Sequence, residues 1–196
     1  MTGISRGRWG RASWLCVAAA CGGRAGSGAG AVGPATVRVV PTSTAIVLET
    51  AGPPPSDTAV TFTTGRPCSI VLRHGPPEDV VFAELSFPAR AFRADSGREV
   101  RVDVRPRPGV YGLDVSTSLP LGDGATITFK YARYFSAPAR ARVAYGGDVM
   151  YERALSVGEL LPDSTRMALL PSTRPAADNL RAALPAAGTY LVAAAP

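Results

Sequence analysis

The sequence predicts an all-β protein: an antiparallel β-sandwich that follows a signal peptide and a flexible linker. Three observations support this prediction. Many short segments alternate apolar and polar residues, the 18 prolines and 21 glycines favour short elements joined by turns, and no convincing amphipathic helix is present. A parallel sheet would need helical crossovers of ten or so residues, and the sequence indicates none.

The clearest strand runs from Glu99 to Arg105. Val100, Val102 and Val104 share one face and charged residues share the other, which is the period of two of a half-buried strand. Pro106 ends the pattern, because proline cannot donate a hydrogen bond to a neighbouring strand. Further strands are predicted at residues 36–40, 44–50, 59–64, 68–72, 80–85, 111–116, 125–131, 140–145, 149–153, 167–170, 179–184 and 189–194, with a helical turn at 157–161.

The first 20 residues have the composition of a secretory signal. Arginines at positions 6, 8 and 11 precede a short apolar run, residues 14–20, which ends in small residues before Cys21. This run is shorter than the roughly 20 apolar residues needed to cross a bilayer. Small residues before a cysteine resemble the lipobox of bacterial lipoproteins. We therefore predict a lipoprotein-type signal peptide at 1–20, lipidation of Cys21, and an exported protein that is anchored in the bacterial cell envelope or secreted.

Two regions follow the predicted signal. Residues 21–35 are rich in glycine and alanine and indicate a flexible tether. Residues 36–196 form the predicted β-sandwich domain, with two subdomains dividing near residue 85 as a possible arrangement. Under an alternative interpretation the signal is cut elsewhere, and Cys21 is then available to form a disulfide with Cys68.

The positive charge does not indicate nucleic-acid binding. The formal charge is +6, but the predicted signal contains three arginines, so the mature chain has 18 basic and 15 acidic residues. Lys130 is the only lysine and no glutamine occurs, a skew typical of GC-rich coding. Basic and acidic residues alternate rather than cluster, whereas a phosphate-tracking surface needs clustered cations. We predict no nucleic-acid partner.

The chain is poor in residues that perform chemistry. His74 is the only histidine, so a Ser/His/Asp triad would have to use it. It lies in a predicted turn, where we expect a solvent-facing polar residue. Zinc sites need several cysteine and histidine ligands, and the turn aspartates lack the dense spacing of a calcium loop. We predict no catalytic residue, no metal and no cofactor.

Aromatic residues cluster after the predicted strand 125–131 and offer a candidate binding patch. Arg133, Tyr134 and Phe135 could form an exposed recognition surface with cation–π character. The alternative, which we favour, is that the rings cap one end of the sandwich core.

Residues 85–190 resemble ZU5-like β-sandwich modules, including those of secreted bacterial proteins. The matching segments are residues 86–92, 100–104, 125–131 and 142–145, the last leading into a Gly-Asp turn at 147–148. The resemblance implies a β-sandwich. Some family members cleave themselves at a His-Phe-Ser site, but residues 186–190 keep only the tyrosine of that pattern, Tyr190. Gly188 has no hydroxyl and Ala186 no imidazole, so we expect no self-cleavage.

These observations favour a non-enzymatic interaction or structural module with an unknown protein or glycan partner, attached to the membrane through a lipid on Cys21. The alternative is a small envelope hydrolase or carbohydrate-binding protein that uses acidic residues on the sheet. A pocket lined by two carboxylates and an aromatic platform would favour the alternative, and a flat surface would favour the first.

Overall fold

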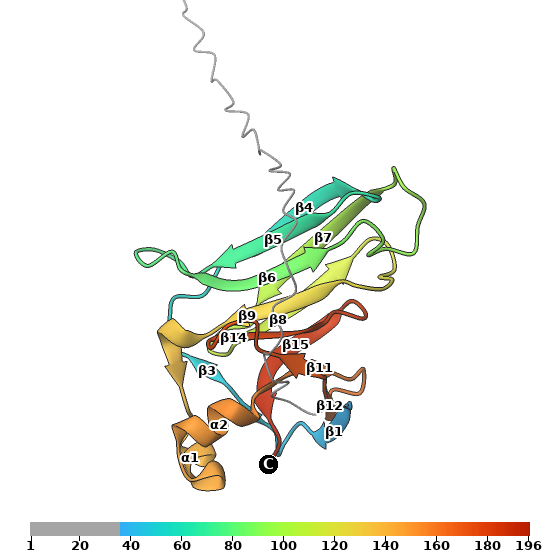
Figure 1. Ribbon diagram of the computed structural model, residues 1–196. Coiled ribbons are helices and arrows are strands. Elements are labelled where there is room, and N and C mark those ends of the chain that lie inside the picture. The colour runs from blue at the N-terminus through green and yellow to red at the C-terminus, as the bar shows by residue number, and fades with distance from the viewer. Residues whose placement is uncertain (1–35) are drawn as a thin grey trace, which may run out of the picture.

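Antiparallel strands dominate the computed structural model, which describes residues 36–196 (Figure 1). Two main sheets pack face to face in a sandwich, which confirms the predicted fold class. The predicted signal peptide, the tether and Cys21 lie outside the described residues. The position near residue 85, where two subdomains could divide, falls within strand β6 (Val81–Phe87).

The larger sheet has eight strands, and every pairing in it is antiparallel. The short strand β2 (Ile46–Val47) pairs with β15 beside the main path. The order along the main path is β1 (Arg38–Pro41), β12 (Arg166–Leu169), β11 (Ser156–Leu160), β15 (Gly188–Ala194), β8 (Gly112–Thr117), β7 (Glu99–Pro106) and β4 (Thr58–Thr63).

The smaller sheet has five strands and is also antiparallel. Its order is β13 (Ser172–Thr173), β14 (Asn179–Ala183), β9 (Thr126–Lys130), β6 and β5 (Cys68–Arg73). A third, two-stranded pairing joins β3 (Glu49–Thr50) to β10 (Phe135–Ser136), so the predicted strand 44–50 is divided into β2 and β3.

The hydrophobic core lies between the two main sheets. Val100, Val102 and Val104 of β7 are fully buried, as their alternation predicts. From the facing sheet Phe82 enters the same cluster, stacked on Tyr111 with ring centroids 5.1 Å apart. Burial of such side chains, at about 25 cal/mol per Å² of apolar surface, is the main stabilisation of the sandwich.

Residues 139–154 form two short helices, and the strands predicted at 140–145 and 149–153 are wrong. α1 (Ala139–Tyr145) follows Pro138 and ends at Gly146, whose φ of 71° lies in the left-handed region that favours glycine. α2 (Asp148–Ala154) has an acidic residue in its first turn and a basic one in its last, as the helix dipole favours. The alternation of arginine and alanine in α1 resembles a strand, but both residues are strong helix formers.

The helical turn predicted at 157–161 is also wrong, because these residues belong mainly to β11. β11 lies between β12 and β15, so its backbone groups are paired on both sides. Gly158 sits under the side chain of Met167, which would collide with any Cβ at that position. The glycine thus reflects close packing across the sheet rather than a turn.

Candidate functional site: a charged hollow

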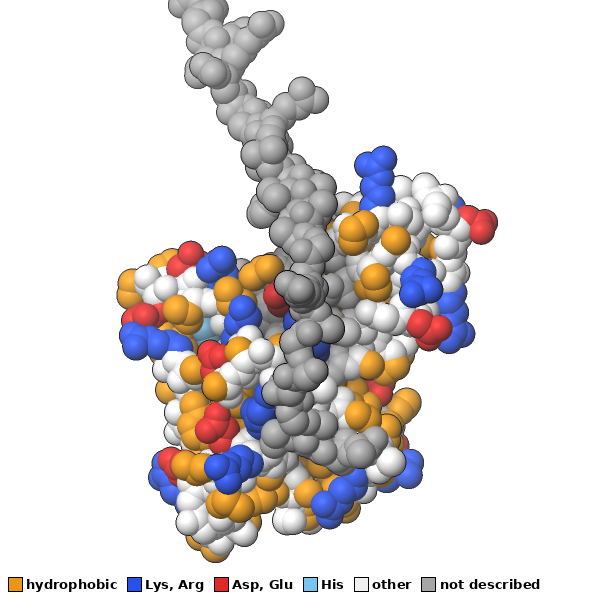
Figure 2. All heavy atoms as spheres, in the orientation of Figure 1, with side chains coloured by type: hydrophobic (Ala, Val, Ile, Leu, Met, Phe, Trp, Pro, Cys, Tyr) orange, Lys and Arg blue, Asp and Glu red, His pale blue; other side chains and the backbone are white. Residues whose placement is uncertain are grey.

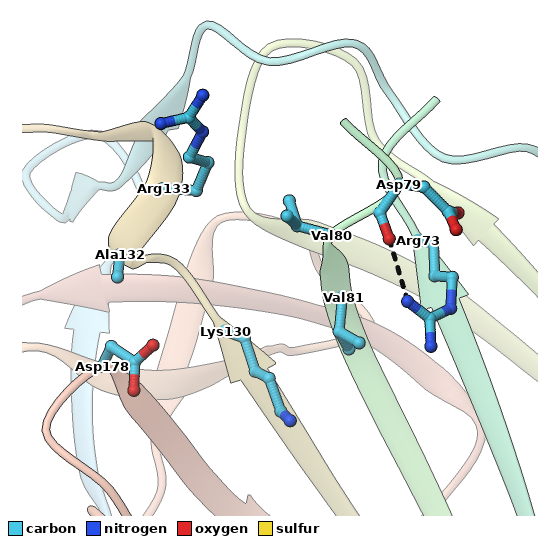
Figure 3. A pocket seen from close by; sticks show the side chains of 8 residues that line it. All are labelled: Arg73, Asp79, Val80, Val81, Lys130, Ala132, Arg133 and Asp178. Atoms are coloured by element: carbon cyan, nitrogen blue, oxygen red, sulfur yellow. Dashed lines mark hydrogen bonds between the residues drawn. The ribbon is translucent and has the colours of Figure 1, made fainter. Parts of the chain in front are cut away.

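A hollow of about 690 Å³ opens at one end of the five-stranded sheet (Figure 3). The loop between β5 and β6, the 3₁₀ turn η1 (Ala132–Tyr134) and the segment before β14 meet around it. The hollow is shallow and faces solvent. Its lining comprises three cationic, two acidic and three small apolar residues: Arg73, Lys130, Arg133, Asp79, Asp178, Val80, Val81 and Ala132.

Lys130 reaches the hollow because it ends β9 on the outer face of the sheet. Its neighbour Phe129 is fully buried in the core, so the alternation of the strand directs Lys130 outward. The outer face of β9 is not uniformly exposed, because Arg181 covers Thr128 and donates a hydrogen bond to its hydroxyl at 3.0 Å. Within residues 36–196, no hydrogen bond or ion pair engages the Lys130 ammonium. Its charge is available to a ligand.

The two arginines of the hollow are held in place by the β5–β6 loop. Arg133 makes a bidentate ion pair with Glu78, with N–O distances of 2.9 and 3.1 Å, and this carboxylate raises the pKa of Arg133. Arg73 donates a hydrogen bond to the backbone carbonyl of Asp79 at 2.9 Å, drawn as a dashed line in Figure 3. A carbonyl carries no formal charge, so this hydrogen bond does not neutralise the positive charge of Arg73. Both guanidinium groups are thereby fixed by contacts with this loop.

Two carboxylates complete the charged lining. Asp79 lies in the β5–β6 loop and Asp178 just before β14, on opposite sides of Lys130 in Figure 3. Across the described part of the chain, neither carboxylate forms an ion pair with a cation of the hollow. Apart from Arg133, which is paired with Glu78, the charged groups of the hollow are therefore not paired with one another.

The predicted patch Arg133, Tyr134 and Phe135 is divided between the surface and the core. Arg133 is exposed and lines the hollow. Tyr134 is half-buried, lies over Gly52 and meets His74 edge-on at 4.6 Å. Phe135 is half-buried and packs near Tyr131, with centroids 5.9 Å apart. Both rings lie against the core cluster, as the capping interpretation expects.

His74 is buried, so its expected solvent-facing position is wrong. Only 2% of it is exposed, and its ring packs edge-on against Phe82 at 5.1 Å. Its Nδ1 lies 2.8 Å from the carbonyl oxygen of Pro53, and Nδ1 carries the proton because a carbonyl can only accept. The loop containing Gly52 and Pro53 folds over the histidine, a contact that local sequence does not reveal.

A polar cluster that the sequence analysis missed joins β9 to the helices. Arg174 donates hydrogen bonds to the Tyr131 hydroxyl and to the Glu152 backbone carbonyl, and its guanidinium lies 5.8 Å from the Tyr131 ring centre. The Tyr131 hydroxyl in turn donates to the Glu152 carboxylate at 3.2 Å. Burial raises the pKa of Tyr131 to about 12. The contacts are internal, which indicates that this cluster fastens α2 to the sandwich.

Within residues 36–196, no three histidine, cysteine or acidic side chains gather as a metal site would require. No helix in this range is long and apolar enough to cross a membrane. Comparison with family models, curated proteins and solved structures found no significant match. The resemblance to ZU5-like modules therefore stays a prediction, and the hollow must be interpreted from its own chemistry.

Proposed function

We propose that this protein is a non-enzymatic, exported interaction module, and that its hollow binds an acidic glycan. The single observation that carries the proposal is the charge arrangement of the hollow. Arg73, Lys130 and Arg133 contribute to the lining of one shallow space, and the Lys130 ammonium has no partner among residues 36–196. Export and anchoring through Cys21 are supported by the composition of the first 35 residues.

The mixture of charges favours a sugar acid over a simple anion. Guanidinium and ammonium groups donate charge-assisted hydrogen bonds to carboxylates. Asp79 and Asp178 are acceptors, which suit the hydroxyl groups of a sugar. A polymer of uronic acids offers both groups in each unit. No aromatic residue belongs to the lining, so the recognition is polar rather than a stacking platform.

Binding of alginate, a polyuronate, tests the proposal against dextran as a neutral glycan. Wild-type protein should bind alginate and not dextran, with affinity that falls as salt rises. Lys130→Gln combined with Arg73→Gln should weaken alginate binding about tenfold or more, since a charged hydrogen bond contributes about 1.5–3 kcal/mol.

Arg66→Gln combined with Arg98→Gln provides the matched control, because both are exposed arginines outside the hollow. The control also removes two positive charges and should leave alginate binding within about twofold of wild type. Equal loss of alginate binding in the control and in the hollow variant would show that net charge alone explains the binding. This outcome would refute the proposed site.

The hydrolase alternative is favoured by one feature, the presence of Asp79 and Asp178 in the same hollow. Paired carboxylates can act as acid and base on a glycosidic bond. If wild-type protein releases reducing ends from alginate and Asp178→Asn abolishes the release, the protein is a hydrolase and the non-enzymatic proposal is wrong. The non-enzymatic proposal expects no release of reducing ends.

Lipidation is tested separately, by labelling expressing cells with palmitate. Wild-type protein should take up label and Cys21→Ser should not. Equal labelling of both forms, or none in the wild type, would remove the lipid anchor from the proposal while leaving the hollow untouched.

A further inference from the structure

The two helices expose an unusual amount of apolar surface. Val143 is 87% exposed, Val149 61% and Met150 54%. Across residues 36–196, only three other large hydrophobic side chains are exposed, and two of them, Val37 and Val39, lie at the start of β1. Three exposed apolar side chains on two adjoining helices indicate an interaction surface.

Helix geometry explains why these side chains point away from the protein. In α1 the buried Ala141 and the half-buried Tyr145 are four residues apart and face inward, which places Val143 on the opposite side. In α2 the buried Tyr151 faces inward, and Val149 lies on the opposite side. The buried residues of each helix therefore determine that Val143 and Val149 are exposed.

The same two helices also carry arginines. Arg140 and Arg153 are exposed and make no ion pair within the described residues. Arg142 is paired with Asp148 at 2.8 Å, and Glu152 accepts a hydrogen bond from Tyr131. Hydrophobic and arginine side chains are interspersed over the lower left end of the molecule in Figure 2, where α1 and α2 lie in Figure 1.

The helices also lie near the point where the preceding 35 residues join the domain. The Tyr145 hydroxyl donates to the carbonyl of Ala195 at 2.6 Å, and the positive charge of Arg38 in β1 acts on the same hydroxyl. The 15 residues from Cys21 to Ala35 can span at most roughly 50 Å when fully extended. A lipid on Cys21 would therefore keep this end of the domain close to a membrane.

We propose that the helical hairpin α1–α2 docks on an anionic lipid surface. Val143, Val149 and Met150 enter the headgroup region, while Arg140 and Arg153 contact lipid phosphates. The hairpin protrudes from the sandwich in Figure 1, a shape that suits insertion into an interface. This inference requires neither a lipid on Cys21 nor a ligand in the hollow.

The test measures binding of the full chain, with Cys21→Ser to prevent lipidation, to vesicles of phosphatidylglycerol and phosphatidylcholine. Hydrogen exchange is measured for each peptide, so it distinguishes membrane contact by the hairpin from membrane contact by residues 1–20. Peptides from residues 139–154 should gain protection with the anionic vesicles and not with pure phosphatidylcholine. Val143→Ser/Val149→Ser/Met150→Ser and Arg140→Gln/Arg153→Gln should each reduce this protection at least about fivefold.

Val71→Ser is the matched control, since Val71 is 45% exposed on β5. It should leave hairpin protection unchanged. Unprotected hairpin peptides in the presence of vesicles, or equal protection in the hairpin variants and the control, would overturn the inference. Because alginate binding is measured without vesicles, failure here leaves the proposed function standing, and the converse also holds.

Discussion

The interior of the sandwich and the α1–α2 hairpin are held in place in different ways. Inward residues of both sheets share one continuous cluster, so many contacts support each strand. The hairpin depends on a few anchors, chiefly the buried Ala141 and Tyr151 and the hydrogen bond of Tyr145. Many shared contacts support the sheets, whereas the hairpin reaches the same cluster only through the side chains on its inner side. An interaction surface is best placed on such an element.

The largest expected effect comes from removing an interior ring. Phe82→Ala should lower the free energy of unfolding by about 3–5 kcal/mol, because Phe82 is 1% exposed and packs on Tyr111 and Phe129. Urea denaturation measures this loss. Val71→Ala on the adjacent strand β5, where the side chain is exposed, should cost less than about 0.5 kcal/mol. Similar losses in the two variants would contradict the distinction between interior and surface.

Alternation in the sequence predicts the interior well. Strand 99–105 matches β7, and its three valines are buried, because burial on one face imposes a period of two directly on the residues. The hairpin has no such signature. Its alternation of arginine and alanine has the period of a strand, while the signals that decide its structure are Pro138 before α1 and Gly146 after it.

The candidate site could be predicted only in part. The outward direction of Lys130 follows from the alternation of β9, and Arg133 follows it by three residues. Arg73 and Asp178 join them only through the pairing of β5, β6, β9 and β14, which brings distant segments together. The burial of His74 likewise depends on a loop 21 residues away, through Pro53.

An intermediate effect tests the anchoring of the hairpin. The Tyr151 hydroxyl, buried beneath the helices, donates to the carbonyl of Ile46 at 3.2 Å. Tyr151→Phe should cost about 1 kcal/mol, because the carbonyl then lacks its partner. Hydrogen exchange should accelerate in residues 139–154 and stay unchanged in β7. Val143→Ser alters the exposed side of α1 and should change neither region, while acceleration spread evenly over both sheets would show that the hairpin is part of the same cooperative unit.

The smallest expected effect concerns a carboxylate on the larger sheet. Burial raises the pKa of Glu159 in β11, although a weak hydrogen bond from Tyr190 opposes this. A raised pKa in the folded state means that the ionised form is the less favourable one there. The contribution of Glu159 to stability is then complete below its unfolded pKa of about 4.3 and is lost as the pH rises through the folded value.

Glu159→Gln removes this penalty and keeps an oxygen that can accept the hydrogen bond from Tyr190. Because the side chain is half-buried, the gain at pH 7 should be below about 1 kcal/mol, a rise in Tm of about 1–3 °C. Below pH 4 the variant and the wild type should melt together. Glu99→Gln at the exposed start of β7 controls for the change in net charge and should leave Tm within about 1 °C. A gain for Glu159→Gln that persists at pH 3 would mean that packing, rather than the cost of burying a charge, sets the stability of this strand.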